Sequence, residues 1–151
     1  MYKSFAIATC SKYVTVAYKR TTVLSGTLDS NHSSSLAVDG VTLCPQNSNL
    51  VAVSNWSPVP WLMIQLDTTY YIEKVVIYAG DGVYASQAND IEIAIDVYKY
   101  LCGGLYPGPT AGNDVILFMC PPGSRGSSVT IQKIASGYVY LGICEVEVYG
   151  F

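Results

Sequence analysis

Two acidic residues far apart in the chain, Asp39 and Glu145, have the setting that best suits binding of an ion. Asp39 belongs to the segment 36–44, which also holds a turn glycine and a cysteine, and Glu145 follows a cysteine at the start of the run 144–150. If these segments pair, they bring two carboxylates beside several backbone carbonyls, and such oxygen-rich sites suit Ca²⁺. The alternative is that Asp39 caps the turn at Gly40 while Glu145 is solvated, and the residues alone favour it.

The cysteines and the single histidine argue against other site chemistry. Five cysteines stand apart, at positions 10, 44, 102, 120 and 144, with no CxxC pair, so a zinc site is not expected. Separated cysteines fit an oxidising compartment, which predicts a secreted or extracellular protein. The histidine has no Ser or Cys nucleophile near it in a recognisable order, and no glycine-rich phosphate loop follows a strand. We therefore predict that the protein is not an enzyme.

The composition describes one domain with a large core and little charge. The chain has 151 residues, of which 50% are hydrophobic and 13% charged, and its net charge is -3. Nothing in it could neutralise a run of phosphates, so nucleic acid is not an expected partner. No apolar run reaches ~18 residues, so no membrane span is predicted. The mean hydropathy of +0.30 fits either a thick β core or a surface covered partly by other subunits.

The pattern along the chain is that of strands separated by loops. Short alternating runs bounded by Gly, Pro, Ser and Asn recur, which predicts an all-β sandwich or barrel. The expected strands include 62–66, 72–78, 129–132 and 115–119, the last uniformly apolar and expected to be buried. Residues 91, 93 and 95 are expected to point inward and 92, 94 and 96 outward. Long loops are expected over 45–60, 79–89 and 103–113. We divide the chain into an N-terminal arm, 1–12, and a domain, 13–151.

Five blocks carry a resemblance to a known family. They are 15–19 (TVAYK), 34–40 (SSLAVDG), 60–66 (PWLMIQL), 75–78 (VVIY) and 144–150 (CEVEVYG). In this order they resemble the F-type lectins, or fucolectins, and more distantly the discoidin and coagulation-factor C domains, over roughly residues 14–151. The resemblance implies a jellyroll-like antiparallel β-sandwich with its binding loops at one end. It also implies binding of fucose-containing glycans and a structural Ca²⁺.

The resemblance assigns ligands and disulfides to particular residues. Asp39 and Glu145 would supply side-chain oxygens to Ca²⁺, and backbone carbonyls would come from Leu36, Val41, Leu43 and Cys144. Such a set fits the six to eight oxygens that Ca²⁺ takes. The family pattern also implies disulfides Cys44–Cys144 and Cys102–Cys120. Cys10 is then left over, either buried and inert or bonded to a neighbouring subunit or to a segment outside this chain.

The chain departs from the family where fucose is bound. The family's fucose-binding His is replaced by Gln46, its Arg-Gly-Asp-Cys-Cys stretch becomes 79–83 (AGDGV), in which Asp81 survives, and its second Arg falls near Ser86 or Gln87. A hydrogen bond to a charged group contributes ~1.5–3 kcal/mol, so two missing Arg contacts remove roughly 3–6 kcal/mol. A monosaccharide bound at millimolar strength has about 4 kcal/mol in all. Fucose binding in the usual geometry should therefore be close to abolished.

Two functions remain open after this departure. The loops still carry polar residues that suit an uncharged glycan other than fucose, with Trp56 or Tyr84 as a stacking platform. The candidate carbohydrate-binding residues are Gln46, Asn47, Asp81, Tyr84, Ser86 and Gln87, with Asn49 and Asn89 beside them. The loops would otherwise be merely solvated. The alternative function is a self-assembling structural or adhesive subunit, whose apolar arm over 5–9 adds to the sheet edge of a neighbour.

Overall fold

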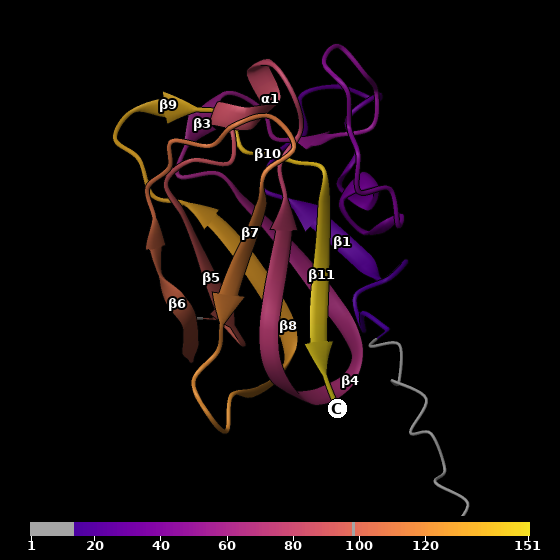
Figure 1. Cartoon of the computed structure of the whole chain (residues 1–151), viewed down its shortest axis with the longest axis vertical. Coiled ribbons are helices and arrows are strands. Elements are labelled where there is room, and N and C mark those ends of the chain that lie inside the picture. The colour runs from indigo at the N-terminus through magenta and orange to yellow at the C-terminus, as the bar shows by residue number, and fades with distance from the viewer. Residues whose placement is uncertain (1–13, 98) are drawn as a thin grey trace, which may run out of the picture.

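A computed structural model describes residues 14–97 and 99–151, and in it the chain forms two facing antiparallel sheets. The predicted arm, with Cys10, lies outside the described residues. One long strand, β4 (Trp61–Tyr78), belongs to both sheets, because it sweeps round one end of the molecule and changes partners on the way (Figure 1). This confirms the predicted all-β sandwich. Within the described residues, no helix is long and apolar enough to span a membrane.

Each half of β4 organises one sheet. The first half lies in a sheet of order β1-β4-β8-β5-β6, and the second half lies between β7 and β11 (Figure 1). The remaining strands of the two sheets are β1 (Thr21–Leu24), β5 (Ile91–Ile95), β6 (Tyr100–Tyr106), β7 (Val115–Met119), β8 (Arg125–Lys133) and β11 (Glu145–Gly150).

Short elements gather at the end of the sandwich opposite the turn of β4, at the top of Figure 1, and we call this the loop end. Two small antiparallel pairs lie there, β2 with β10 and β3 with β9, together with helix α1. A 3₁₀ helix, η1, packs beside β1, β2 and β11. The bounds are β2 (Ala52–Val53), β3 (Ser57–Pro58), β9 (Tyr138–Val139), β10 (Gly142–Ile143), α1 (Val83–Ser86) and η1 (Ser34–Val38).

The core between the sheets follows the predicted alternation in the long strands. The inward positions of β4 and β5 that the sequence predicts, Leu62, Ile64, Leu66, Ile91, Ile93 and Ile95, are all buried. Ala94, which was expected to face outward, is buried as well. Its short side chain lies on a strand paired on both sides, with Leu101 of β6 and Thr130 of β8 as its register partners. Alternation alone does not detect such coverage by neighbouring strands.

The prediction of a buried strand over 115–119 is right about the strand and wrong about its burial. Ile116 and Phe118 are buried, but Val115, Leu117 and Met119 expose 59%, 56% and 57% of their surface. The strand pairs with β4 and lies at the margin of its sheet, so one of its faces points out of the sandwich. A uniformly apolar run gives no indication that alternate side chains are exposed, because every position is equally suited to the core.

Both predicted disulfides are present. Cys44–Cys144 joins the loop after η1 to the residue before β11, with a separation of 100 residues. Cys102–Cys120 joins β6 to the residue after β7, with a separation of 18 residues. The first therefore fastens the end of the chain to an early loop, and the second fastens the margins of the two sheets to each other.

Candidate functional site

The two acidic residues expected to bind an ion lie together in the structure. Asp39 ends η1, and Glu145 is the first residue of β11. The Gly40 amide donates to Glu145 Oε2 at 3.1 Å, and the Val41 amide donates to Asp39 Oδ1 at 2.9 Å. The turn at Gly40 thus holds both carboxyl groups, and neither is a freely solvated surface group.

Glu145 is in an unfavourable setting for an isolated carboxylate. It exposes 1% of its surface, and its Oε1 has no hydrogen-bond partner within the described part of the chain. Burial, followed by the adjacent carboxyl group and charge of Asp39, raises the pKa of Glu145 to about 9. A buried acidic oxygen with an adjacent second carboxyl group is the kind of donor that a hard cation binds.

The other expected ligands are backbone carbonyls of the same two segments, 36–43 and 144–145. Leu36 belongs to η1, Val41 and Leu43 follow Gly40, and Cys144 precedes Glu145. The Cys144 Sγ atom lies 3.5 Å from the Val41 carbonyl oxygen, so these two segments are in contact. No cluster of three or more His, Cys, Asp or Glu side chains occurs in the described residues, so any cation here must depend on carbonyl oxygens as well. The residues present fit Ca²⁺ on this basis.

Apart from Tyr84, the predicted carbohydrate-binding residues fall into two groups. Gln46 and Asp81 lie around Gly82, the residue before α1, and Asn47 follows Gln46 in the chain. The Asp81 amide donates to the Cys44 carbonyl at 3.0 Å, and its Oδ1 accepts from the Gly82 amide at 2.8 Å. A Cβ on Gly82 would lie 2.6 Å from Gln46 Cγ, and its φ of +61° also favours glycine. Asp81 thus orders its own turn, and the Gln46 side chain packs against it.

Tyr84 belongs to neither group, and its predicted role as a stacking platform is wrong. It exposes 8% of its surface, and its hydroxyl donates to the Ser48 carbonyl at 2.9 Å and lies 3.2 Å from His32 Nε2. His32 Nδ1 in turn donates to Asp29 Oδ1 at 2.7 Å, and this bond lowers the pKa of Asp29. Through the Tyr84 hydroxyl, these bonds tie α1 to the loop of Asp29 and His32 and to the loop of Ser48, which is a structural role.

The second group, Ser86 and Gln87, lines a cavity of about 540 Å³ at the loop end. Asn89 and Trp56 line it too, as expected of polar loops with an aromatic platform. Trp56 exposes 55% of its surface, and its ring centroid lies 4.9 Å from that of Tyr140. The remaining lining residues are Val83, Asp90, Lys133, Ala135, Val139 and Tyr140.

Sequence reasoning missed the buried cation of this cavity. Lys133 is buried, and its Nζ donates to the carbonyls of Ser86 and Gln87, each at 3.1 Å. Burial lowers its pKa, and the charge of Asp90 partly opposes this. The ammonium thus binds the carbonyls at the end of α1, where a positive charge is favourable. Lys133 shares the parity of Val129 and Ile131, so strand alternation contained the signal that it points inward.

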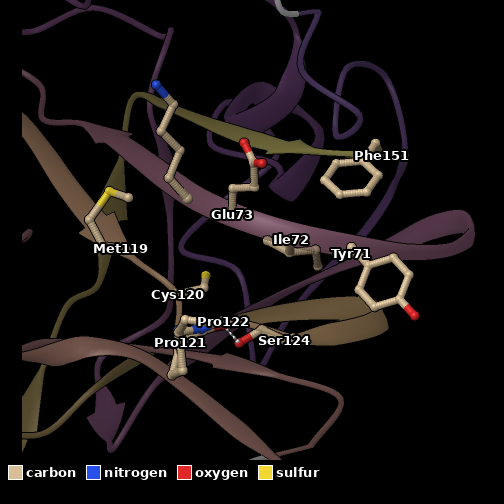
Figure 2. A pocket seen from close by; sticks show the side chains of 11 residues that line it. Tyr71, Ile72, Glu73, Met119, Cys120, Pro121, Pro122, Ser124 and Phe151 are labelled. Carbon is tan, nitrogen blue, oxygen red and sulfur yellow. Dashed lines mark hydrogen bonds between the residues drawn. The ribbon is translucent and has the colours of Figure 1, made fainter.

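A second cavity, of about 560 Å³, lies at the opposite end, beside the turn of β4. Figure 2 shows the rings of Tyr71 and Phe151 on one side and Met119 on the other, with Pro121 and Pro122 below. None of the predicted carbohydrate-binding residues lines it. The loop-end cavity therefore remains the candidate site for a glycan.

The fold is that of lectin-like carbohydrate-binding modules, and the structure is similar to several of known function. One is a fucose-binding module of Streptococcus pneumoniae, with 28% sequence identity, a TM-score of 0.73, and coverage of 91% of this chain and 98% of that one. Another is the fucolectin of striped bass (Morone saxatilis) serum, with 24% identity and a TM-score of 0.78; it covers 90% of this chain, which spans 47% of that protein. These similarities confirm the resemblance to F-type lectins and the discoidin-like fold.

The same fold also occurs in modules named for other glycans. A chitosan-binding module from a Paenibacillus chitosanase/glucanase has 18% identity, a TM-score of 0.61, and coverage of 90% of this chain and 98% of that one. No protein-family model matches the chain, and no curated protein matches it. The fold thus indicates carbohydrate binding without restricting it to fucose.

Proposed function

We propose that this protein is an extracellular glycan-binding module that no longer binds fucose in the usual geometry and is not an enzyme. The observation that carries the proposal is the loop-end cavity, where an exposed Trp56, amide side chains and a buried Lys133 meet on a carbohydrate-binding fold. Ala79 and Gln46 stand where the resemblance places an Arg and a His, and Ala79 is buried. The two disulfides support an oxidising location.

The cavity suits a neutral pyranose. The Trp56 ring offers a face for the C–H surface of a sugar, backed by Tyr140. Asp90 and Lys133 contribute one negative and one positive charge, so a neutral ligand meets no net charge and can donate hydroxyls to one and accept from the other. Asn89 Oδ1 is occupied by the Thr110 amide at 3.0 Å, so its amide nitrogen is the group left for a ligand.

We also propose a structural Ca²⁺ at the seam of η1 and β11. Asp39 and Glu145 would hold it through carboxylate oxygens, with carbonyls of Leu36, Val41, Leu43 and Cys144 completing the set. The support is the buried, unpartnered Glu145 Oε1 beside a second carboxyl group. A bound cation would neutralise the two carboxylates and so hold the loop before Cys44 in place. The glycan would be bound by other residues.

A glycan array tests the proposed function. Wild-type protein should bind a set of uncharged glycans, and Trp56→Ala should weaken that binding at least about tenfold, since it removes the stacking surface. Tyr71→Ala is the matched control, because Tyr71 is an exposed aromatic residue at the opposite end. Gln46→Ala and Asp81→Ala should have small effects.

Three results would count against this assignment. If no glycan binds at high protein density, the glycan-binding function is wrong. If Tyr71→Ala abolishes binding and Trp56→Ala does not, the site is the cavity beside the turn of β4. If Gln46→Ala or Asp81→Ala abolishes binding and Trp56→Ala is silent, the sugar binds around Gly82. The alternative of self-assembly through the arm concerns residues outside the described part and stays a prediction.

A further inference from the structure

The strand β7 has an open backbone edge. Register and hydrogen bonds show which way its groups point: the Cys120 amide donates to the Glu73 carbonyl at 2.9 Å, and the Ala79 amide donates to the Asp114 carbonyl at 2.9 Å. Even-numbered residues of this segment therefore face β4, and the N–H and C=O groups of the odd-numbered residues point the other way. Within residues 14–97 and 99–151, β4 is the strand that pairs with β7, and no second strand pairs with it.

The same odd-numbered residues carry the exposed apolar side chains. Val115, Leu117 and Met119 each expose more than half of their surface, and Val76 of β4 lies beside Leu117 in register. β6 does not cover this face, since it approaches from the inner side, where a Cβ on Gly103 would lie 3.5 Å from the Phe118 ring. Natural proteins usually protect sheet edges with charges, prolines or bulges. Here a five-residue edge strand has no charged residue at all.

We propose that β7 is a self-association edge, which pairs in antiparallel fashion with β7 of a second copy of this chain about a two-fold axis at Leu117. Its open N–H and C=O groups are available to pair with another strand, and the strand is its own complement. Val115 of one copy then faces Met119 of the other, Leu117 faces Leu117, and the exchanged N–H···O=C bonds close the ladder. No like charges meet across the axis, because the segment is uncharged.

The ends of the strand fix this register. On one side Asn113 has a φ of +61°, which ends the extended backbone, and Asp114 would bring charge into a longer ladder. On the other side Cys120 is bonded to Cys102, and Pro121 and Pro122 have no N–H to donate. Pairing is therefore confined to 115–119, and the register centred on Leu117 is the one that uses every open group. One such strand pair is small, so we expect a dimer that forms with increasing concentration.

Sedimentation velocity from low to several hundred micromolar protein tests the proposal, with Cys10→Ser in every sample so that any dimer is non-covalent. The parent protein should move from the mass of a monomer to that of a dimer, and Leu117→Lys should remain a monomer throughout. Val23→Lys is the matched control, because Val23 is an exposed apolar residue (42%) on the edge strand β1 of the other sheet, and it should dimerise like the parent. Unfolding curves confirm that each variant is folded.

The outcomes that overturn the proposal are distinct. A parent protein that stays monomeric, or a Leu117→Lys variant that dimerises equally well, rules out this edge. If Phe5→Asp/Ile7→Asp in the full chain abolishes the dimer, the occupant of the edge is the arm of another copy, and β7 self-pairing is wrong. Hydrogen exchange separates backbone pairing from side-chain contact, because the amides of 115, 117 and 119 should gain protection at high concentration. None of these results depends on whether a glycan binds.

Discussion

Glu145 is the residue whose buried carboxyl group is not fully hydrogen-bonded by the described part of the protein. Its carboxyl group is buried, one of its oxygens has no partner among the described residues, and Asp39 lies next to it. A buried charge without a partner is costly, and two adjacent carboxylates repel each other. The local Asp-Gly and Cys-Glu patterns singled out these two residues, and the family resemblance assigned them to one site. Strand alternation indicated that Lys133 points inward, but its partners, the carbonyls of Ser86 and Gln87 at the end of α1, could not be predicted from the sequence.

Removal of calcium should destabilise the protein through this pair. A ligand present at 100 times its Kd stabilises the folded state by about 2.7 kcal/mol, which corresponds to roughly 5–10 °C in Tm for a chain of this size. Thermal unfolding with Ca²⁺ and with chelator should show this difference. Glu145→Gln should abolish the difference and, in chelator, should be at least as stable as the wild type, since it replaces a buried acid whose ionised form is disfavoured there with a neutral amide of similar shape.

The control for this experiment is Glu147→Gln, on the same strand. It makes the same Glu-to-Gln replacement, and Glu147 bonds the Tyr78 hydroxyl instead of the Asp39 region. Its Tm should be lower overall because that bond is weakened, but the response to chelator should be retained. A wild-type unfolding curve that is the same in Ca²⁺ and in chelator would rule out the metal site.

Among the elements, strands with one buried face and one solvent-exposed face could be predicted from the sequence. Strands whose pairing partners are unusual could not. β4 is one strand of 18 residues, but the polar stretch Asp67-Thr68-Thr69 divides it into two apparent runs in the sequence. These residues sit where β4 bends from one sheet to the other, and its pairing with β8 shifts register between Gln65 and Tyr70. The prediction for β7 was wrong for a different reason, because its uniformly apolar sequence gave no indication of an open edge. Both errors concern partners, which periodicity does not specify.

The disulfide between β6 and the end of β7 should contribute to stability without touching the metal site. Cys102→Ala/Cys120→Ala opens a loop of 18 residues, worth about 3 kcal/mol, so the Tm should fall by roughly 6–12 °C. The response to chelator should remain, because neither cysteine adjoins Asp39 or Glu145. Thermal unfolding of the double variant with and without Ca²⁺ measures both quantities.

The other disulfide provides the comparison. Cys44→Ala/Cys144→Ala opens a loop of 100 residues, worth about 4.7 kcal/mol at most, and it also frees the residue next to Glu145. This variant should lose both stability and the chelator response. Equal chelator responses in the two double variants would show that the Cys44–Cys144 bridge does not hold the metal site in place.

At the scale of the whole molecule, the resemblance of five short blocks was enough to predict the sandwich, because they include the early and late segments that meet in the fold. The blocks around Asp39 and Glu145 lie side by side, although 105 residues separate Gly40 from its hydrogen-bond partner Glu145. The blocks do not specify the loop-end surface. Trp56 and Tyr140 come from loops that lie far apart in the chain and meet because β3 pairs with β9. Their encounter is therefore a product of the fold.

The positions of the glycan cavity and of β7 together predict how a dimer would act. An antiparallel β7 pair reverses the strand direction between the two copies, and β7 runs from the loop end toward the opposite end (Figure 1). The two loop ends then point to opposite poles, so one dimer should bridge two glycan-bearing surfaces and not bind one flat surface twice. Vesicles that display a glycan to which the protein binds should aggregate, and their turbidity should rise, at protein concentrations where the dimer forms.

Leu117→Lys separates binding from bridging in this assay. It should bind the vesicles as tightly as the wild type, because Leu117 is remote from Trp56 and Lys133, but it should not aggregate them. Trp56→Ala should dimerise normally and fail at both binding and aggregation. If Leu117→Lys aggregates vesicles as well as the wild type, bridging does not run through β7. Loss of aggregation in Phe5→Asp/Ile7→Asp would then assign bridging to the arm, and its persistence would point to a second glycan site on each copy, such as the cavity beside Tyr71 and Phe151.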